Sequence, residues 1–208
     1  IIFLFCLFKE SQDSPNLVVC PATLVSNWSR EIEKFAPDLN VYEHKGPLRT
    51  GSAEFLREHD VVITSYDTLI SSEGEMRLIF GKIDWALVVL DEAQAIKNPE
   101  AKRSGYVKRL SCAAGIAVTG TPLENRMTDV WSLFDFCLPG FLGDLGGFEE
   151  RYPNDIASAA RLEGAITPFI LRRLIGEVKD DLPERIDVEH SIRMSEQEEE
   201  DYLGYIHT

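Results

Sequence analysis

The sequence has little of what a metal-stabilised or disulfide-stabilised fold requires. Its four cysteines form no C-x-x-C pair, and its four histidines show no ligand spacing. Zinc sites and disulfide frameworks depend on such spacing, so the pattern argues against both. The cysteines favour a reducing compartment. Cys20, which lies in an apolar run, is expected to be a buried free thiol.

Basic residues are also scarce. The chain has 21 Lys and Arg against 35 Asp and Glu, which gives a formal net charge of −14. Modules that bind nucleic acid through a broad surface carry a basic face, and this composition argues against that class. Any contact with nucleic acid is therefore expected to be local, or to be supplied largely by residues outside this chain.

No apolar run is long enough to cross a membrane. The opening segment Ile1–Phe8 is apolar throughout, but a membrane-spanning helix needs roughly 20 such residues. A signal peptide would add a basic start and a small-residue cleavage site, and the sequence shows neither. No membrane partner is expected, and Ile1–Phe8 is interpreted as a helix buried in a globular core.

From Asn16 to Pro139, short apolar runs alternate with amphipathic stretches. The expected strands are 17–20, 39–42, 61–64, 85–90 and 115–118, and the expected helices are 23–35, 51–58, 66–80, 99–110 and 128–137. Continuous apolar strands separated by helices predict an α/β fold with a parallel sheet covered on both faces. Functional residues of such sheets collect at the carboxyl ends of the strands.

A second region begins at Pro139. The segment Gly140–Gly147 holds four glycines and is interpreted as a linker. The chain beyond it is more acidic and helical, so we predict a lobe of residues 1–139 followed by a helical extension of residues 140–208. The acidic run Glu196–Asp201 is read as a solvated helix face, with a contact to a basic partner as the alternative.

The strongest chemical signal follows the run Ala86–Leu90, which ends abruptly in Asp91 and Glu92. Adjacent carboxylates at the exit of a buried strand are costly unless a cation or a reaction uses them. Phosphoryl transfer uses both, one to hold magnesium and one to orient or deprotonate the attacking water. The alternative is a turn with two solvated acids.

A second cluster follows the next strand. Thr119, Gly120 and Thr121 come 28 residues after the acidic pair begins, since 119 − 91 = 28. The hydroxyls could hydrogen-bond the neighbouring acidic strand end and relay nucleotide state to a bound strand. An ordinary turn at a helix start is the alternative for this cluster taken alone.

Together these clusters resemble a known family. Asp91–Gln94 with Ile96–Asn98 resembles motif II of the Swi/Snf ATPases, a branch of helicase superfamily 2, and Thr119–Arg126 resembles motif III. Gln94 stands where many members have His, and its amide still donates and accepts hydrogen bonds.

Further segments match the same family in order. Leu17–Pro21 with Asn27–Trp28 resembles motif Ia, and Ile63–Asp67 resembles the next motif that follows the DNA backbone. Pro168–Arg173 and Asp181–Pro183 resemble the stretch leading towards a second lobe. The resemblance implies a RecA-like lobe of the P-loop NTPase type, with ATP and Mg²⁺ as cofactors and double-stranded DNA as partner.

The resemblance also implies roles for individual residues. Asp91 would hold Mg²⁺, Glu92 would act as the base and Gln94 would bond the residues that couple ATP to DNA. The implied coupling residues are Thr119, Gly120 and Thr121, and the implied DNA contacts are Thr23, Asn27, Thr64, Ser65 and Lys97. As alternatives, Thr23 caps a helix, Trp28 fills the core and Lys97 is a solvated surface lysine.

Two departures from the family bear on activity. No G-x-x-x-x-G-K-[ST] loop occurs in the sequence, and a second lobe with its arginine fingers is absent. That loop cradles phosphates with its backbone N–H groups, so the chain alone is expected to be inactive. We expect the loop to precede Ile1, with Ile1–Phe8 as the remains of the helix that follows it.

For the intact protein, the resemblance implies an ATP-driven translocase on double-stranded DNA. A further expected partner is a DNA-bound protein complex, such as a nucleosome, a repair protein or RNA polymerase. The expected location is the nucleoid of a bacterial cytoplasm or a eukaryotic nucleus. The alternatives are another superfamily 2 helicase and a non-catalytic binding module derived from an ATPase lobe.

Overall fold

We describe the fold from a computed structural model of the chain. The described residues are 1–11, 13–71, 79–120, 126–173, 195, 197, 198 and 202. The chain divides into two compact units, Ile1–Ala165 and Ile166–Thr208, and each is described by itself.

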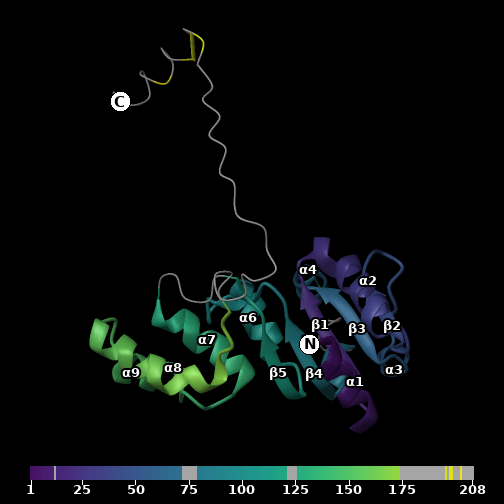
Figure 1. Cartoon of the computed structure of the whole chain (residues 1–208), viewed down its shortest axis with the longest axis horizontal. Coiled ribbons are helices and arrows are strands. Elements are labelled where there is room, and N and C mark those ends of the chain that lie inside the picture. Colours follow the sequence, from purple (N-terminus) through teal and green to yellow (C-terminus); the bar gives the residue numbers. More distant parts are fainter. Residues whose placement is uncertain are drawn as a thin grey trace, which may run out of the picture. The chain divides into compact units, whose positions relative to one another are not determined.

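The first unit is built on a five-stranded sheet with the order β2-β3-β1-β4-β5 (Figure 1). The strands are β1 (Asn16–Cys20), β2 (Val41–His44), β3 (Val61–Ser65), β4 (Trp85–Leu90) and β5 (Cys112–Ala117). All four neighbouring pairs are parallel, and the central strand β1 pairs Val19 with Thr64 on one side and Leu90 on the other. The predicted parallel α/β sheet is confirmed.

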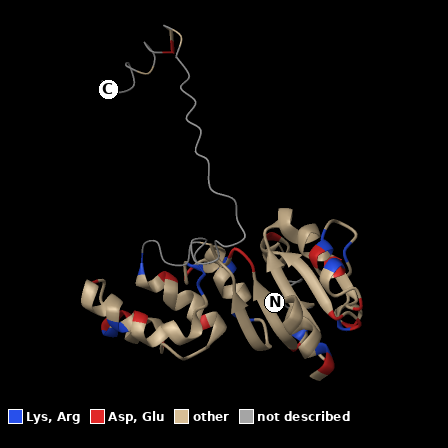
Figure 2. Cartoon of the chain, viewed as in Figure 1, with Lys and Arg blue, Asp and Glu red and all other residues tan. Residues whose placement is uncertain are grey.

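Helices cover both faces of the sheet. One face packs on α1 (Ile2–Ser11) and α2 (Val25–Phe35) through a core that includes Phe5, Val18, Ile32 and Val89. The other face packs on α3 (Ala53–Arg57), α4 (Tyr66–Ile70), α6 (Lys102–Val107) and α7 (Met127–Cys137). The inner strands β1, β3 and β4 contain no charged residue, and the charged residues lie mainly on helices and loops (Figure 2).

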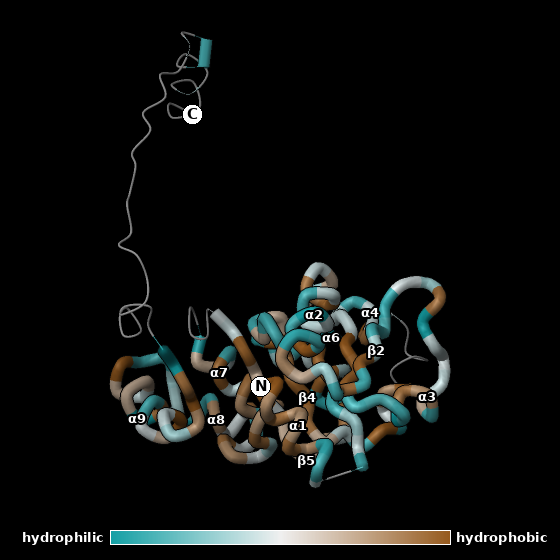
Figure 3. The backbone as a smooth tube through the Cα atoms, turned by 45° about the vertical axis from the view of Figure 1, so that its right-hand side comes forward, coloured by the Kyte–Doolittle hydropathy of each residue, from teal (hydrophilic) through white to brown (hydrophobic). Residues whose placement is uncertain are grey.

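Helix α1 is apolar over most of its length (Figure 3). Its Phe5 side chain is fully buried, whereas Phe3 is 71% exposed. The expected buried helix is therefore buried on one face only. Lys9 fixes its end by an ion pair of 2.8 Å with Asp60. None of the described helices is long and apolar enough to span a membrane.

Several shorter elements differ from the sequence expectations. A 3-10 turn, η1 (Ala22–Leu24), precedes α2. Helix α4 ends at Ile70, and of the helix expected up to residue 80, positions 72–78 lie outside the described residues. Further 3-10 turns are η2 (Phe80–Lys82) and η3 (Ala93–Ile96).

The interpretation of Gly140–Gly147 as a linker is wrong. Gly140 and Gly143 have φ values of 80° and 79°, which suit glycine, and they form a turn that leads into α8 (Leu145–Arg151). The Asp144 side chain caps this helix by accepting a hydrogen bond from the Gly147 N–H at 2.9 Å. Trp131 of α7 donates to the Gly143 carbonyl at 3.0 Å. The segment Gly140–Gly147 is therefore held by hydrogen bonds to α7 and within α8, and it is part of the folded unit.

Helix α9 (Ile156–Ile166) follows α8, so residues beyond 140 are helical here as expected. In the second unit, a 3-10 turn η4 (Thr167–Phe169) leads to exposed residues up to Arg173. Asp181–Pro183 lie outside the described residues, as does part of Glu196–Asp201. The domain boundary at Pro139 stays a prediction.

Candidate functional site

The acidic pair lies where three parallel strands end together. Asp91 follows β4, and its N–H donates to the Val19 carbonyl of β1 at 2.9 Å. On the other side, the Ala93 N–H donates to the Val118 carbonyl after β5 at 2.8 Å. Both carboxylate residues are half-buried. The sheet therefore holds the backbone of this turn at fixed positions and leaves the carboxylates accessible from one side.

Glu92 adopts a left-handed backbone conformation, with φ 51° and ψ 51°. It is the one residue other than glycine with a positive φ in the described part of the chain. This conformation costs a residue with a Cβ roughly 1–2 kcal/mol. Such strain persists where the surrounding structure enforces it, and it collects at functional sites.

Gln94 joins the acidic turn to the end of β5. Its Nε2 donates to Glu92 Oε2 at 2.5 Å, and its Oε1 accepts from the Thr119 hydroxyl at 2.7 Å. The hydrogen bond between Gln94 and Thr119 is the one the sequence suggested. Gly120 is exposed beside it, and Thr121 lies outside the described residues.

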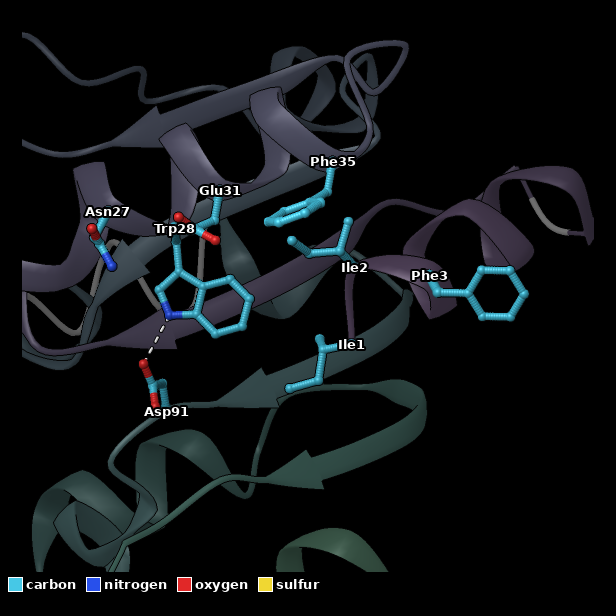
Figure 4. Close-up of a pocket in the computed structure, with 8 residues that line it drawn as sticks. All are labelled: Ile1, Ile2, Phe3, Asn27, Trp28, Glu31, Phe35 and Asp91. Atoms are coloured by element: carbon cyan, nitrogen blue, oxygen red, sulfur yellow. Dashed lines mark hydrogen bonds between the residues drawn. The ribbon is translucent and has the colours of Figure 1, made fainter. Parts of the chain in front are cut away.

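Trp28 makes a contact that the sequence reasoning missed. Its indole N–H donates to Asp91 Oδ2 at 2.8 Å (Figure 4). The ring also packs against the core that α2 covers, so the expected role in the core holds only in part. Because α2 follows β1 and β1 neighbours β4, the first turns of α2 lie beside the end of β4. That adjacency follows from the strand order, so the motifs alone could not have revealed the contact.

Tyr66 also contacts Asp91. Tyr66 follows β3, which lies on the opposite side of β1 from β4. Its hydroxyl donates to the Asp91 carbonyl at 2.9 Å. Burial, with a further contribution from the Asp91 charge, raises the pKa of Tyr66, so the hydroxyl stays protonated and remains a donor. The Arg103 guanidinium lies over the Tyr66 ring and pairs with Asp67 at 2.9 Å.

Cys20 is buried at the end of β1, and its thiol donates to the Thr64 carbonyl at 3.7 Å. Burial, together with the nearby Asp91 charge, raises the pKa of the Cys20 thiol to about 12. The expected buried free thiol is confirmed. A thiol held in this neutral form is a poor nucleophile.

A pocket of about 490 Å³ opens beside Asp91. Its lining combines two separate carboxylates, Glu31 of α2 and Asp91 after β4, with apolar and aromatic side chains (Figure 4). The lining residues are Ile1, Ile2, Phe3, Asn27, Trp28, Glu31, Phe35 and Asp91.

The predicted DNA contacts separate into exposed and buried residues. Thr23 is exposed in η1, and neither η1 nor α2 has a side-chain cap, so the capping alternative for Thr23 is wrong. Asn27 is exposed on α2, where its Oδ1 accepts from Arg30 at 3.5 Å. Lys97 is exposed and lines a second pocket of about 370 Å³, which also includes Arg126.

Thr64 and Ser65 do not offer their hydroxyls to a ligand. Thr64 is fully buried, and its hydroxyl donates to the His44 carbonyl at 3.0 Å. Ser65 is 4% exposed and caps α4 by accepting from the Thr68 N–H at 3.1 Å. Local hydrogen bonds already occupy both hydroxyls, so the expected DNA contacts through these two side chains do not fit the structure.

The acidic turn fits a magnesium ion better than a metal that needs a full protein cage. Among the described residues, no group of three or more His, Cys, Asp or Glu is arranged to hold a metal. Mg²⁺ is usually held by one or two carboxylates, completed by waters and substrate phosphates. Asp91 alone, or Asp91 with Glu92, satisfies that requirement.

The parallel sheet with helices on both faces, and with acids at the exit of the inner strand β4, is the architecture of the RecA-like class of α/β ATPase lobes. The family profile of the SNF2-related domain matches residues 1–208. The chain therefore belongs to the SNF2 family and is an ATPase/helicase-like domain of that family. The Swi/Snf resemblance of the sequence is confirmed.

Individual relatives agree with this assignment. The chain is 38% identical over 208 residues to YwqA of Bacillus subtilis, covering 94% of this chain and 22% of YwqA. It is 36% identical over 214 residues to the TATA-binding protein-associated factor mot1 of Schizosaccharomyces pombe, covering 91% of this chain and 11% of mot1.

The fold agrees with solved structures of the same family. The Sulfolobus solfataricus SWI2/SNF2 ATPase core in complex with double-stranded DNA superposes with a TM-score of 0.76 at 35% identity. The match covers 88% of this chain and 39% of that one. The chain thus spans less than a quarter of the two curated relatives and less than half of the archaeal core.

Proposed function

We propose that the protein containing this chain is an ATP-driven translocase on double-stranded DNA. The chain contributes most of the first ATPase lobe, residues 1–139, and a helical extension, residues 140–208. The observation that carries the proposal is the hydrogen-bonded series Glu92–Gln94–Thr119, which links the acidic turn to the neighbouring strand end. The archaeal SWI2/SNF2 core bound to double-stranded DNA supports the choice of partner.

Asp91 and the residues of the series have distinct tasks. Asp91 would hold Mg²⁺, which would bring positive charge to the ATP phosphates when bound. Glu92 would orient the attacking water and accept its proton, because it follows Asp91 directly and its carboxylate is held by the Gln94 amide. Thr119, through Gln94, would couple the position of Glu92 to the segment Gly120–Thr121 that follows β5.

DNA would be contacted by residues that lie exposed near the carboxyl ends of the strands. Thr23, Asn27 and Lys97 remain as proposed contacts, with hydroxyl, amide and ammonium groups suited to phosphate oxygens. Such contacts position the protein without reading base sequence. The net charge of −14 keeps them local.

The chain by itself should not turn over ATP, because none of its 208 residues form a G-x-x-x-x-G-K-[ST] loop. In the intact protein we propose a DNA-bound protein complex as the object that is moved. Similarity to mot1, named as a TATA-binding protein-associated factor, supports a partner of that kind. The location would follow the DNA, in the nucleoid or the nucleus.

The test is ATP hydrolysis by the full-length protein with and without duplex DNA, beside a Glu92→Gln variant. Loss of a positioned general base costs about 10²–10⁴-fold in rate, so stimulation by duplex DNA should disappear in the variant. Hydrolysis in neither protein would leave a non-catalytic binding module. Strand displacement from short duplexes would instead favour another superfamily 2 helicase.

A further inference from the structure

Asp91 receives hydrogen bonds from two aromatic side chains that the proposed mechanism does not use. Trp28 donates to its carboxylate Oδ2 at 2.8 Å, and Tyr66 donates to its backbone carbonyl at 2.9 Å. The second carboxylate oxygen, Oδ1, accepts from the Glu92 N–H at 3.0 Å. The carboxylate is thus oriented from both of its oxygens, and its main chain is held separately.

An indole N–H is well suited to fix a carboxylate. It is a donor only, it has one hydrogen, and it moves on a side chain with two torsions. The Trp28 ring is half-buried against the core under α2, which restrains those torsions. One donor on each oxygen still leaves lone pairs of Asp91 available for a cation.

The two aromatic residues belong to the segments that follow β1 and β3. Trp28 lies on α2, whose Val25 and Ile32 are buried in the core, so the helix is anchored to the sheet. Asn27, a proposed DNA contact, precedes Trp28 directly. Tyr66 is the first residue of α4. Each segment therefore has a direct bond to Asp91.

We propose that Trp28 is a positioning residue that sets the orientation of the Asp91 carboxylate for Mg²⁺, with Tyr66 fixing the Asp91 backbone. The inference rests on the proposed function, because it assigns Trp28 a part in the same site. It adds a second link between the DNA-facing edge and the acidic turn. That link acts on Asp91, whereas the Gln94–Thr119 link acts on Glu92.

The competing explanation is that Trp28 only fills space in the core. A second tryptophan, Trp131, serves as the matched control for this explanation. Trp131 of α7 is also largely buried, and its indole N–H also donates one hydrogen bond, to the Gly143 carbonyl at 3.0 Å. Replacing either tryptophan by Phe removes the N–H and keeps an aromatic ring. Only Trp28→Phe removes a donor to Asp91.

The first measurement is the Mg²⁺ concentration needed for nucleotide binding by full-length wild type, Trp28→Phe and Trp131→Phe, using a fluorescent ATP analogue at equilibrium. Removing a residue that orients a metal ligand typically weakens metal affinity about 10–100-fold. We expect a loss of about tenfold for Trp28→Phe and none for Trp131→Phe. Equal Mg²⁺ dependence in the two variants would overturn the proposal.

A second measurement needs no hydrolysis and detects the bond itself. Selective ¹⁵N labelling of tryptophan gives each indole N–H one resonance, and the resonance lost in Trp28→Phe is that of Trp28. Trp28→Tyr serves for this purpose if the Phe variant does not fold. In Asp91→Asn, the Trp28 resonance should move because its acceptor loses its charge, while that of Trp131 stays. An unmoved Trp28 resonance would show that the indole does not bond Asp91.

These outcomes are independent of the proposed motor activity. If wild type binds nucleotide but shows no hydrolysis stimulated by DNA, the translocase proposal fails while the Mg²⁺ comparison still decides the role of Trp28. If hydrolysis is stimulated by DNA but both Phe variants bind Mg²⁺ like wild type, the role of Trp28 fails alone.

Discussion

The ends of β4 and β3 both carry adjacent polar residues, but they differ in what those residues do. After β4, Asp91 and Glu92 are half-buried, and Glu92 has a left-handed backbone. At the end of β3, Thr64 and Ser65 are buried, relaxed and bonded to nearby main chain or to the next helix. Polar residues at the carboxyl edge of a parallel sheet are therefore candidates for a site only where they remain accessible.

The difference between accessible and buried polar residues is tested most directly by removing one hydroxyl of each kind, in Thr119→Val and Thr64→Val. Thr119→Val removes the hydroxyl that donates to Gln94, so we expect hydrolysis stimulated by DNA to fall about tenfold, the equivalent of ~1.4 kcal/mol. The measurement is kcat with and without duplex DNA in the full-length protein. Thr64→Val is the matched control and should keep its stimulation. Equal losses of stimulation in the two variants would contradict the distinction.

A stability measurement sharpens the same contrast. Thr64→Val leaves the buried His44 carbonyl without its hydroxyl donor, and Ser65→Ala removes the cap of α4. Each change should lower the free energy of unfolding by about 1–2 kcal/mol. Denaturant titration followed by circular dichroism measures this loss. Thr23→Ala, which removes an exposed hydroxyl that caps no helix, should leave the stability unchanged.

Backbone strain at Glu92 provides a third test, in which the substitution is expected to raise the stability and not to lower it. Glycine adopts positive φ without the Cβ penalty, so Glu92→Gly should raise the free energy of unfolding by up to about 1 kcal/mol while lowering the rate of hydrolysis about 10²–10⁴-fold. The stability is measured by thermal melting and the rate by phosphate release. A variant that is less stable than wild type would show that the Glu92 side-chain bond to Gln94 outweighs the strain.

The sequence was sufficient for the sheet because buried parallel strands read as continuous apolar runs, as in Leu17–Cys20 and Ala86–Leu90. The same feature hid the orientation of Thr64, since a strand buried on both faces has no polar face to mark which side a hydroxyl occupies. The Trp28 bond to Asp91 depends on β1 and β4 being neighbours. Strand order is a property of the whole sheet, and no local pattern encodes it.

The smallest expected effect concerns Lys97, which is exposed at the end of η3. Lys97→Gln should weaken binding of full-length protein to duplex DNA only modestly and equally for all sequences, because a phosphate contact carries no base information. The sharper signature is the salt dependence, since one lost contact reduces the slope of log affinity against log salt by about 1. Fluorescence anisotropy at several salt concentrations measures that slope.

Lys34→Gln is a suitable control for this measurement. The Lys34 ammonium lies over the Phe35 ring at the far end of α2, so the substitution should leave the slope unchanged. A slope unchanged in Lys97→Gln would assign Lys97 to the solvated surface.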